Sequence, residues 1–400
     1  MKYSVVTFGC RVNQADSLAI ECELRAQGAE PVTAAKADVV VVNTCSVTAS
    51  ADQGARQTIR RIARENPGAR IVATGCYASR CPSDVSALDG VCLTIPNSHK
   101  EPRTFVATLL EKSTLQPSAH HGPCGRPLQP GLMGRTSWTL RVQTGCSESC
   151  SYCIIPTTRG PGRSRSLADI KCEVEAVVAA GYQEIVITGV HLGSYGRDLQ
   201  PATTLIELVR GLEDAGPLLR ISSLEPMDFP LELLDLKCAP HFHLPLQHGS
   251  DRLLQAMRRP YTLDFYRRLV ATIRHRLPHA AIGSDVIAGF PGETDDDFDS
   301  LTSFLETSPL THLHVFPYSD RPGTQASSMP AKVPGIVTKA RAQRLREISR
   351  MLAERFRMTV SGITRPALTI EDGSIAVTDN YFRVSAPPGH RRNEWIRVTL

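Results

Sequence analysis

The stretch that decides the fold is "ADVVVVNTC", residues 37–45, a short apolar run that ends in a cysteine. Four consecutive valines are typical of a strand that is buried on both faces of a parallel sheet. Similar runs lie on either side of it, "YSVVTFGC" at 3–10 and "RIVATGC" at 70–76. Helical patterns separate the runs, from Ser17 to Gln27 and from about Ala51 to Glu65. This alternation predicts a parallel α/β domain.

Each of these three runs leads into a cysteine: Cys10, Cys45 and Cys76. The carboxyl ends of parallel strands meet at one edge of a sheet, where ligands bind. We therefore predict that the three thiols converge on a metal or cluster site. The alternative is that small apolar cysteines simply end core strands.

A second α/β region follows a segment from about Lys112 to Arg135 that is rich in Pro, Gly and Ser and predicts a linker. Its six predicted strands cover residues 138–143, 184–189, 218–223, 241–246, 281–287 and 312–316. Six βα units indicate a complete or partial barrel with its chemistry at the carboxyl ends of the strands. A basic helix at 337–358 and a tail of short β-like runs complete the chain.

A second cysteine triad is compact and follows the first strand of this region, in "CSESCSYC" at 146–153. A structural zinc site needs four ligands, usually with a second Cys/His pair nearby. The next cysteine, Cys172, falls inside a predicted helix, where we expect a core position. The thiols of Cys146, Cys150 and Cys153 instead fit a [4Fe–4S] cluster with one iron free. A zinc site and inert core cysteines are the alternatives.

The composition bounds the remaining possibilities. The 400 residues include 45 basic and 40 acidic side chains, a net charge of +5 that permits a polyanionic partner without requiring one. The sequence shows no signal peptide and no apolar run long enough to span a membrane, so we expect a cytoplasmic protein. That compartment argues against a disulfide framework for the 12 cysteines. We expect Cys22, Cys92 and Cys238 in the core, Cys124 exposed in the linker, and Cys81 to be a poorer ligand than Cys76.

Together, "CSESCSYC", "GCRVNQADS", "NTCSVT" and "TGCYAS" make the sequence resemble the radical S-adenosylmethionine methylthiotransferases along nearly its whole length. The runs "YCIIPTTRGPGRSRS", "DVIAGFPGET" and "HVFPYSDRPGT" are most similar to the branch that acts on threonylcarbamoyladenosine in tRNA. The sibling branches, which act on isopentenyladenosine in tRNA or on a ribosomal-protein aspartate, are the alternatives.

The resemblance implies a flavodoxin-like methylthiotransferase domain at 1–112 and a linker at 113–135. It further implies a radical S-adenosylmethionine core at 136–358, a partial (βα)6 barrel with the basic helix, and a small TRAM-like β module at 359–400. The implied reaction adds sulfur and methyl at C2 of the threonylcarbamoyladenosine next to the anticodon. S-adenosylmethionine would serve as radical source and methyl donor.

The resemblance also assigns roles to the cysteines and their neighbours. Cys146, Cys150 and Cys153 would hold a [4Fe–4S] cluster whose open iron binds S-adenosylmethionine, while Cys10, Cys45 and Cys76 would hold a second [4Fe–4S] cluster that carries the sulfur. We expect Tyr152 to pack on the adenine and Glu225 to bind the ribose. Gly189 and Gly289 end predicted strands and would let the backbone approach the cofactor; tight βα turns are the alternative explanation.

The implied partners are the anticodon stem-loop of a tRNA and an electron donor such as flavodoxin or ferredoxin. The segment from Lys332 to Arg357 holds eight basic and two acidic residues, which suits phosphate contacts. Arg159, Arg163 and Arg165 follow the compact triad. On this basis, neutralising Arg341, Arg344 and Arg346 should weaken tRNA binding, unless the helix is merely a solvated face.

Two other functional classes are consistent with parts of the sequence. "HFHLPLQH" places His241 and His243 on one strand face, where they could hold the zinc of a barrel metallohydrolase. A non-catalytic iron–sulfur electron carrier would usually need four cysteines for each cluster and has no need of a barrel. The first alternative leaves both cysteine triads without a role.

Overall fold

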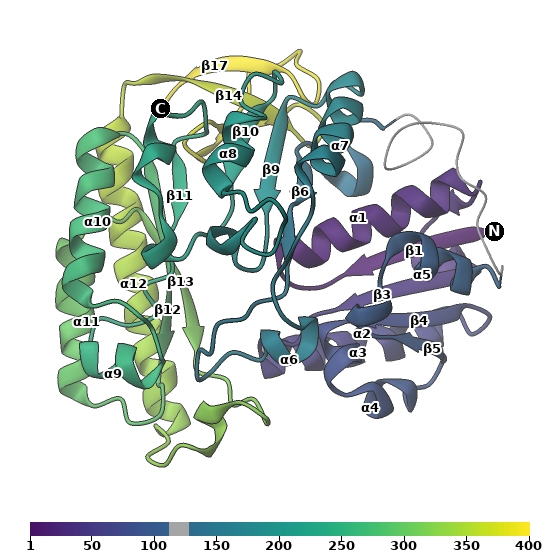
Figure 1. Ribbon diagram of the computed structural model, residues 1–400, viewed down its shortest axis with the longest axis horizontal. Helices are drawn as coiled ribbons and strands as arrows, with labels where there is room; N and C mark the ends of the chain where they lie inside the picture. Colours follow the sequence, from purple (N-terminus) through teal and green to yellow (C-terminus); the bar gives the residue numbers. More distant parts are fainter. Residues whose placement is uncertain (112–127) are drawn as a thin grey trace.

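The computed structural model describes residues 1–111 and 128–400. Most of the predicted linker, with Cys124, lies outside these residues. The N-terminal α/β domain packs beside a larger barrel, and the C-terminal strands lie across one end of that barrel (Figure 1). Within the described ranges, no helix has the length and apolar character to cross a membrane.

The N-terminal domain is built on a five-stranded parallel sheet of order β2-β1-β3-β4-β5. The strands are β1 (Lys2–Thr7), β2 (Glu30–Pro31), β3 (Val39–Thr44), β4 (Arg70–Gly75) and β5 (Val91–Ile95). Its helices are α1 (Arg11–Ala26), α2 (Ala49–Glu65), α3 (Cys76–Arg80), α4 (Pro82–Ser86) and α5 (Pro102–Leu109). The first helix begins earlier than predicted, because the Cys10 carbonyl already accepts a hydrogen bond from Gln14 N.

The four valines of β3 explain why the sheet is covered on both sides. Val39 and Val41 belong to one apolar cluster, which includes side chains of α1 and α5. Val40 and Val42 belong to a second cluster, on the side of α2. Successive side chains of a strand point to opposite faces, so an uninterrupted apolar run is what a sheet with helices on both faces requires.

All six strands predicted for the second region are present. They are β6 (Trp138–Arg141), β9 (Glu184–Thr188), β10 (Leu218–Ile221), β11 (His241–His243), β12 (Ala281–Ala288) and β13 (His312–Pro317). The first three and the last three form two parallel sheets, which isolated bridges between Leu219 and Cys238 and between Ser223 and His243 join. The result is an open barrel whose edge strands are β6 and β13.

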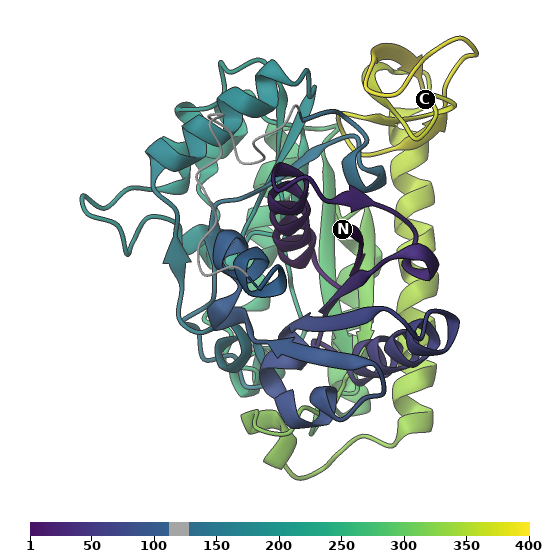
Figure 2. The ribbon, with the colours of Figure 1, turned by 90° about the vertical axis from the view of Figure 1, so that its right-hand side faces the viewer.

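Helices cover the outside of this barrel (Figure 1). They are α7 (Leu167–Ala179), α8 (Leu205–Arg210), α9 (Asp251–Ala256), α10 (Leu263–Arg276), α11 (Asp295–Thr307) and α12 (Gly335–Val360). The long α12 runs along the barrel and leads into an antiparallel sheet of order β16-β15-β14-β17 (Figure 2). These strands are β14 (Thr364–Ile370), β15 (Ile375–Thr378), β16 (Arg383–Ser385) and β17 (Trp395–Thr399).

A buried carboxylate on α1 joins the N-terminal domain to the barrel. Asp16 is 3% exposed and accepts hydrogen bonds from Lys100 Nζ (3.1 Å) in its own domain and from Arg159 Nη2 (2.9 Å) in the barrel. Arg141 of β6 is its third cationic partner. Burial alone would raise the pKa of Asp16, but the three cations outweigh it and hold that pKa well below its ordinary value. We call these four side chains the Asp16 network.

A second buried carboxylate makes a similar connection at the other side of the sheet edge. Asp52, near the start of α2, pairs with Arg321 (2.6 Å) from the segment after β13 and with Arg80 (2.5 Å) of α3. The neighbouring Ala49 N donates to Ser319 Oγ at 2.9 Å. The two networks together fix which edge of the N-terminal sheet faces the barrel.

We expect the Asp16 network to be required for stability. Asp16→Asn leaves Lys100 and Arg159 buried without a counter-charge, which should lower the free energy of unfolding by about 3 kcal/mol. Denaturant unfolding monitored by circular dichroism measures the change. The control is Asp214→Asn, whose pair with Lys237 is exposed to solvent and should contribute little to stability. Equal effects of the two substitutions would contradict a stabilising role for Asp16.

Candidate functional site

The dispersed cysteines converge as the strand order requires. Cys10 precedes α1, Cys45 follows β3 and Cys76 begins α3; the strands that lead into them, β1, β3 and β4, are neighbours in the sheet. Gly9 allows the first two loops to meet: its φ is +88°, and a Cβ there would lie 2.6 Å from Cys45 Sγ. Charges on Cys10 and Cys76 reach Cys45 and raise its pKa, so the three thiols lie near one another.

Burial shapes the chemistry of this triad. Cys45 and Cys76 are 5% and 2% exposed, and burial raises the pKa of Cys45 to about 11. A metal ligand must be a thiolate, so a bound metal has to displace these protons. Two buried cations, Lys100 and Arg159, interact electrostatically with Cys76. They would offset the negative charge of thiolates bound to iron.

The compact triad lies in the loop between β7 (Gln143–Thr144) and α6 (Ile155–Arg159). Ser151, between its cysteines, fixes that loop to the barrel. Its N donates to Met257 O (3.1 Å), its Oγ donates to Ala256 O (2.8 Å), and its carbonyl accepts from Ala326 N (2.7 Å). Three hydrogen bonds from one residue hold the loop in place independently of any bound group.

Two charged side chains that the sequence did not single out contact this triad. Arg259, 6% exposed, donates to Cys150 Sγ at 3.3 Å and pairs with Glu225. His191, 3% exposed, lies 2.7 Å from Asp228 and hydrogen-bonds with Cys146. Burial would lower the pKa of His191, but Asp228 and Cys146 raise it to about 10. The one sequence signal for His191 as a site residue is its position two residues beyond Gly189, at the end of a predicted strand.

The number of ligands at each triad bears on which kind of metal centre it could hold. Among the described residues, only His243, Asp285 and His314 bring three potential ligand atoms within 4.8 Å of one another. Neither cysteine triad does. The thiolates of a tetrahedral zinc site lie about 3.8 Å apart, given Zn–S bonds of about 2.3 Å. Three thiolates at each site match the ligand number of an iron–sulfur cube with one iron left free.

A cavity of about 170 Å³ is lined by residues from the loops of both triads. Val47 and Thr48, which follow Cys45, line one side, and Tyr152, between Cys150 and Cys153, lines another. The rest of its wall is formed by Gln247, Asp285, Ile287, Phe316, Pro317, Tyr318 and Ser319. A ligand in this cavity, which we call the reaction cavity, would touch the loops of both triads.

The predicted contacts to S-adenosylmethionine have clear positions. Tyr152 packs against the apolar cluster around Met257 and Phe290 and lines the reaction cavity. Glu225 is bound to Arg259. A Cβ on Gly189 would lie 3.0 Å from Gln143 Oε1, and one on Gly289 would lie 2.2 Å from Thr338 Oγ1. Neighbouring side chains thus leave no room for a Cβ at either glycine, and contact of the two glycines with a cofactor remains a prediction.

The structure corrects several expectations about individual side chains. Cys92 and Cys172, predicted in the core, are exposed, because the first lies on the edge strand β5 and the second on the outer face of α7. Cys22 is fully buried, as predicted, but is disulfide-bonded. Arg159 is not free for a nucleic acid, since it belongs to the Asp16 network.

Comparisons with known proteins agree with this arrangement. Residues 2–95 match the model of "Uncharacterized protein family UPF0004", and residues 140–305 match that of the "Radical SAM superfamily". The cobalamin- and [4Fe-4S]-bound methyltransferase TsrM of Kitasatospora setae has a similar fold, with a TM-score of 0.58, 17% identity and coverage of 82% of this chain and 76% of that one.

Curated relatives resemble the chain along its length. "Threonylcarbamoyladenosine tRNA methylthiotransferase MtaB" of Aquifex aeolicus is 36% identical over 100% of both chains, and that of Bacillus subtilis is 36% identical over 94% of this chain and 88% of its own. "tRNA-2-methylthio-N(6)-dimethylallyladenosine synthase" of Thermobifida fusca is 33% identical over 88% of this chain and 74% of its own. This similarity along the whole chain shows that it belongs to the radical S-adenosylmethionine methylthiotransferase family.

Proposed function

We propose that the protein adds a methylthio group to C2 of N6-threonylcarbamoyladenosine in the anticodon loop of a tRNA. The observation that carries this proposal is the reaction cavity, whose wall includes residues from both triad loops. Full-length similarity to proteins named for this substrate supports the choice of nucleoside. Activity on dimethylallyladenosine is the second candidate, because relatives with that name are 32–34% identical.

Cys146, Cys150 and Cys153 would hold one [4Fe–4S] cluster, and Cys10, Cys45 and Cys76 the other. When bound, these groups would supply the electron that cleaves S-adenosylmethionine and the sulfur that is inserted. The protein supplies ligands, charge and enclosure: Arg259 donates to Cys150, and Lys100 and Arg159 lie near Cys76. Tyr152, Gly189, Glu225 and Gly289 remain the proposed contacts to S-adenosylmethionine.

The finer domain assignments belong to the same proposal. The strand order β2-β1-β3-β4-β5 supports a flavodoxin-like domain at 1–112, because flavodoxin-like sheets have this order. The four-stranded antiparallel sheet supports a TRAM-like module at 359–400 that follows the core at 136–358. An electron donor such as flavodoxin or ferredoxin and a cytoplasmic location complete the proposal.

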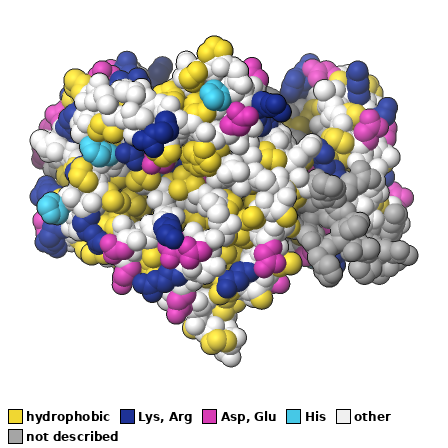
Figure 3. All heavy atoms as spheres, turned by 90° about the horizontal axis from the view of Figure 1, so that it is seen from above, with side chains coloured by type: hydrophobic (Ala, Val, Ile, Leu, Met, Phe, Trp, Pro, Cys, Tyr) yellow, Lys and Arg dark blue, Asp and Glu magenta, His cyan; other side chains and the backbone are white. Residues whose placement is uncertain are grey.

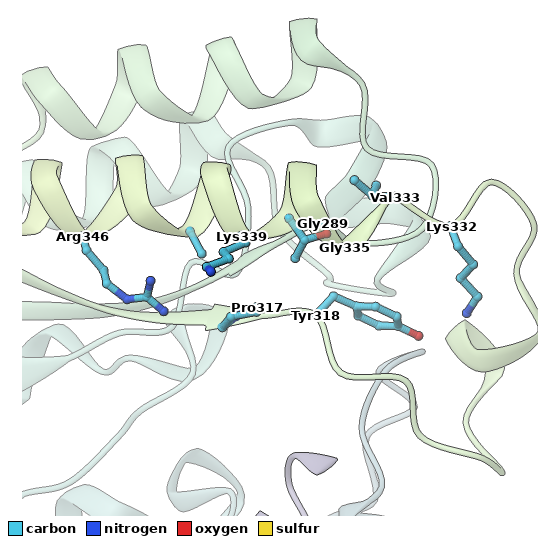
Figure 4. Close-up of a pocket in the computed structure, with 10 residues that line it drawn as sticks. Gly289, Pro317, Tyr318, Lys332, Val333, Gly335, Lys339 and Arg346 are labelled. Carbon is cyan, nitrogen blue, oxygen red and sulfur yellow. The ribbon is translucent and has the colours of Figure 1, made fainter. Parts of the chain in front are cut away.

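A basic groove beside the reaction cavity suits the phosphate backbone of the tRNA. It measures about 340 Å³ and lies between α12 and the end of β13, with Lys332, Lys339 and Arg346 along its wall (Figure 4). The described residues that line it include no Asp or Glu. Pro317 and Tyr318 line both this groove and the reaction cavity, so a phosphate held here would lie next to a nucleoside held there.

The other arginines of α12 are less suited to this role than the sequence suggested. Arg341 is 7% exposed and pairs with Glu293 and Asp295, and Arg344 pairs with Glu306. On the face seen in Figure 3, basic and acidic side chains are interspersed. The triple substitution of Arg341, Arg344 and Arg346 would therefore remove a structural ion pair together with the surface charge.

We expect Lys339→Gln with Arg346→Gln to weaken tRNA binding about tenfold and to reduce the slope of log K against log salt by roughly 1 to 2, because two phosphate contacts are lost. Filter binding at several salt concentrations measures both quantities. The control pair, Lys237→Gln with Arg268→Gln, removes two exposed charges from other elements. A salt slope equal to that of the control would place the RNA elsewhere.

Substitution of single cysteines separates the two proposed clusters. Cys45→Ala should leave cleavage of S-adenosylmethionine intact and abolish methylthiolation, because it removes a ligand of the second site alone. Cys146→Ala should abolish both, and Cys92→Ala, at an exposed cysteine, should spare both. Chromatography of 5′-deoxyadenosine and of digested tRNA measures the two activities. Loss of both in a folded Cys45→Ala protein that retains its first cluster would refute this division.

A further inference from the structure

The inner face of the barrel carries a set of histidines that neither cysteine triad uses. They lie on three adjacent strands, and the registers Gly283↔His312, Asp285↔His314 and His243↔Gly283 place them side by side. A Cβ on Gly283 would lie 2.4 Å from His312 Nε2 and 2.8 Å from His243 Nδ1. The imidazoles of both neighbouring strands therefore fold inward over this glycine.

Asp285 connects two of these imidazoles. Its Oδ1 lies 2.8 Å from His243 Nε2 and 3.2 Å from His314 Nδ1, and the two rings stack with centroids 4.8 Å apart. Burial would raise the pKa of Asp285, but the hydrogen bonds from the two histidines hold it well below its ordinary value. The carboxylate is thus ionised and accepts a hydrogen bond from each ring. We call His243, Asp285 and His314 the histidine cluster.

The histidine cluster adjoins the reaction cavity. Asp285 lines that cavity together with Ile287 and Phe316, which are the next pair along the same register. The side chain of His314 is 58% exposed, whereas that of His243 is 10% exposed. The described residues that line the cavity include no Lys or Arg. A polar group in the cavity would meet Asp285 directly, with the imidazoles of His243 and His314 beside it.

The inner histidines cannot provide a positive charge. Burial, with His243 and His314 nearby, lowers the pKa of His312 to about 4. Burial and the charge of Arg220 lower the pKa of His241 well below its ordinary value, and Nδ1 of this residue is buried without a hydrogen-bond partner. Both rings are neutral at pH 7. The inner pair therefore offers no positive charge, and the donors that remain are the ring N–H groups of His243 and His314 beside Asp285.

The proposed substrate presents the matching chemistry. A threonylcarbamoyl substituent carries a carboxylate, a hydroxyl group and an amide N–H, whereas a dimethylallyl substituent carries none of these. We propose that the histidine cluster recognises the threonylcarbamoyl group, with His314 binding its carboxylate and Asp285 accepting a hydrogen bond from its hydroxyl or N–H. This inference rests on the proposed function and assigns its substrate specificity to named residues.

The same three side chains have the composition of a divalent-metal site, and a metal ion there would have to replace the hydrogens that the rings donate to Asp285. Because Asp285 is ionised, the imidazole nitrogens beside it must carry hydrogens. A nitrogen that carries a hydrogen has no lone pair for a metal ion. Recognition of a polar substituent uses these donors as they stand.

The test compares two anticodon stem-loop RNAs, one carrying threonylcarbamoyladenosine and the other its carboxyl methyl ester. We expect the protein with both clusters loaded to prefer the free acid by about tenfold in kcat/KM, chiefly through KM, because the ester lacks the ionised oxygen that would accept the stronger hydrogen bond from His314. His314→Leu should reduce this preference to about one. The control His275→Leu, at an exposed histidine on α10, should keep it. Cleavage of S-adenosylmethionine without RNA reports folding and cluster loading.

Three results would overturn the inference, and they have different meanings. Undiminished preference for the acid in His314→Leu would show that other residues recognise the carboxylate, and would leave the proposed function intact. A divalent metal ion bound one per chain in addition to cluster iron, and lost in His314→Leu, would identify a metal site instead. Methylthiolation of a dimethylallyladenosine RNA but of neither test RNA would refute the proposed function and the inference together.

Discussion

The buried ion pairs of Asp16 determine how the molecule is assembled. This carboxylate lies on the helix that follows Cys10 and is paired with Arg159, 143 residues away, in the helix that follows the compact triad. Asp52 makes a similar connection beyond Cys45 through Arg321. Charges this deeply buried are tolerated only when they are paired. The N-terminal domain therefore docks with its cysteine edge facing the barrel, and residues from the loops of both triads line one cavity.

Two effects set the charge around the cysteine triads: the raised pKa of buried thiols, and the buried cations beside them. Burial raises the pKa of Cys45 to about 11 and that of Cys153 to about 12, so these two thiols become thiolates only when a metal replaces their protons. The cations beside them, Arg259 at one triad and Lys100 with Arg159 at the other, are held by carboxylates and do not depend on the metal. The protein thus prepares a positive environment for anionic cluster sites before they are filled.

The sequence could predict those features of the fold that rest on a pattern repeated along the chain. Strand–cysteine repeats predicted the sheet edge at which Cys10, Cys45 and Cys76 meet, and six βα units predicted the open barrel. Pairings between distant residues have no such signal, so the partners of Asp16 and the burial of Arg341 emerged only from the fold. Cys172 was misplaced because helical periodicity in a short apolar segment does not settle which face is buried.

For the histidines, too, the sequence did not show which distant residues come together. "HFH" indicated that His241 and His243 share a strand face, but only the register with β12 and β13 adds Asp285 and His314 to them. Metal-ligand spacing in the sequence therefore suggested a zinc hydrolase, whereas the assembled cluster is a hydrogen-bonded set beside the reaction cavity. The register between neighbouring strands decides which side chains meet. A local stretch of sequence does not contain that register.

The most direct test of the account is mass spectrometry of tRNA nucleosides from a strain that lacks this gene and has no redundant enzyme. The account predicts that 2-methylthio-N6-threonylcarbamoyladenosine is absent, that its unthiolated precursor accumulates, and that the intact gene restores the modification. Retention of the methylthio nucleoside in the deletion strain would contradict the account.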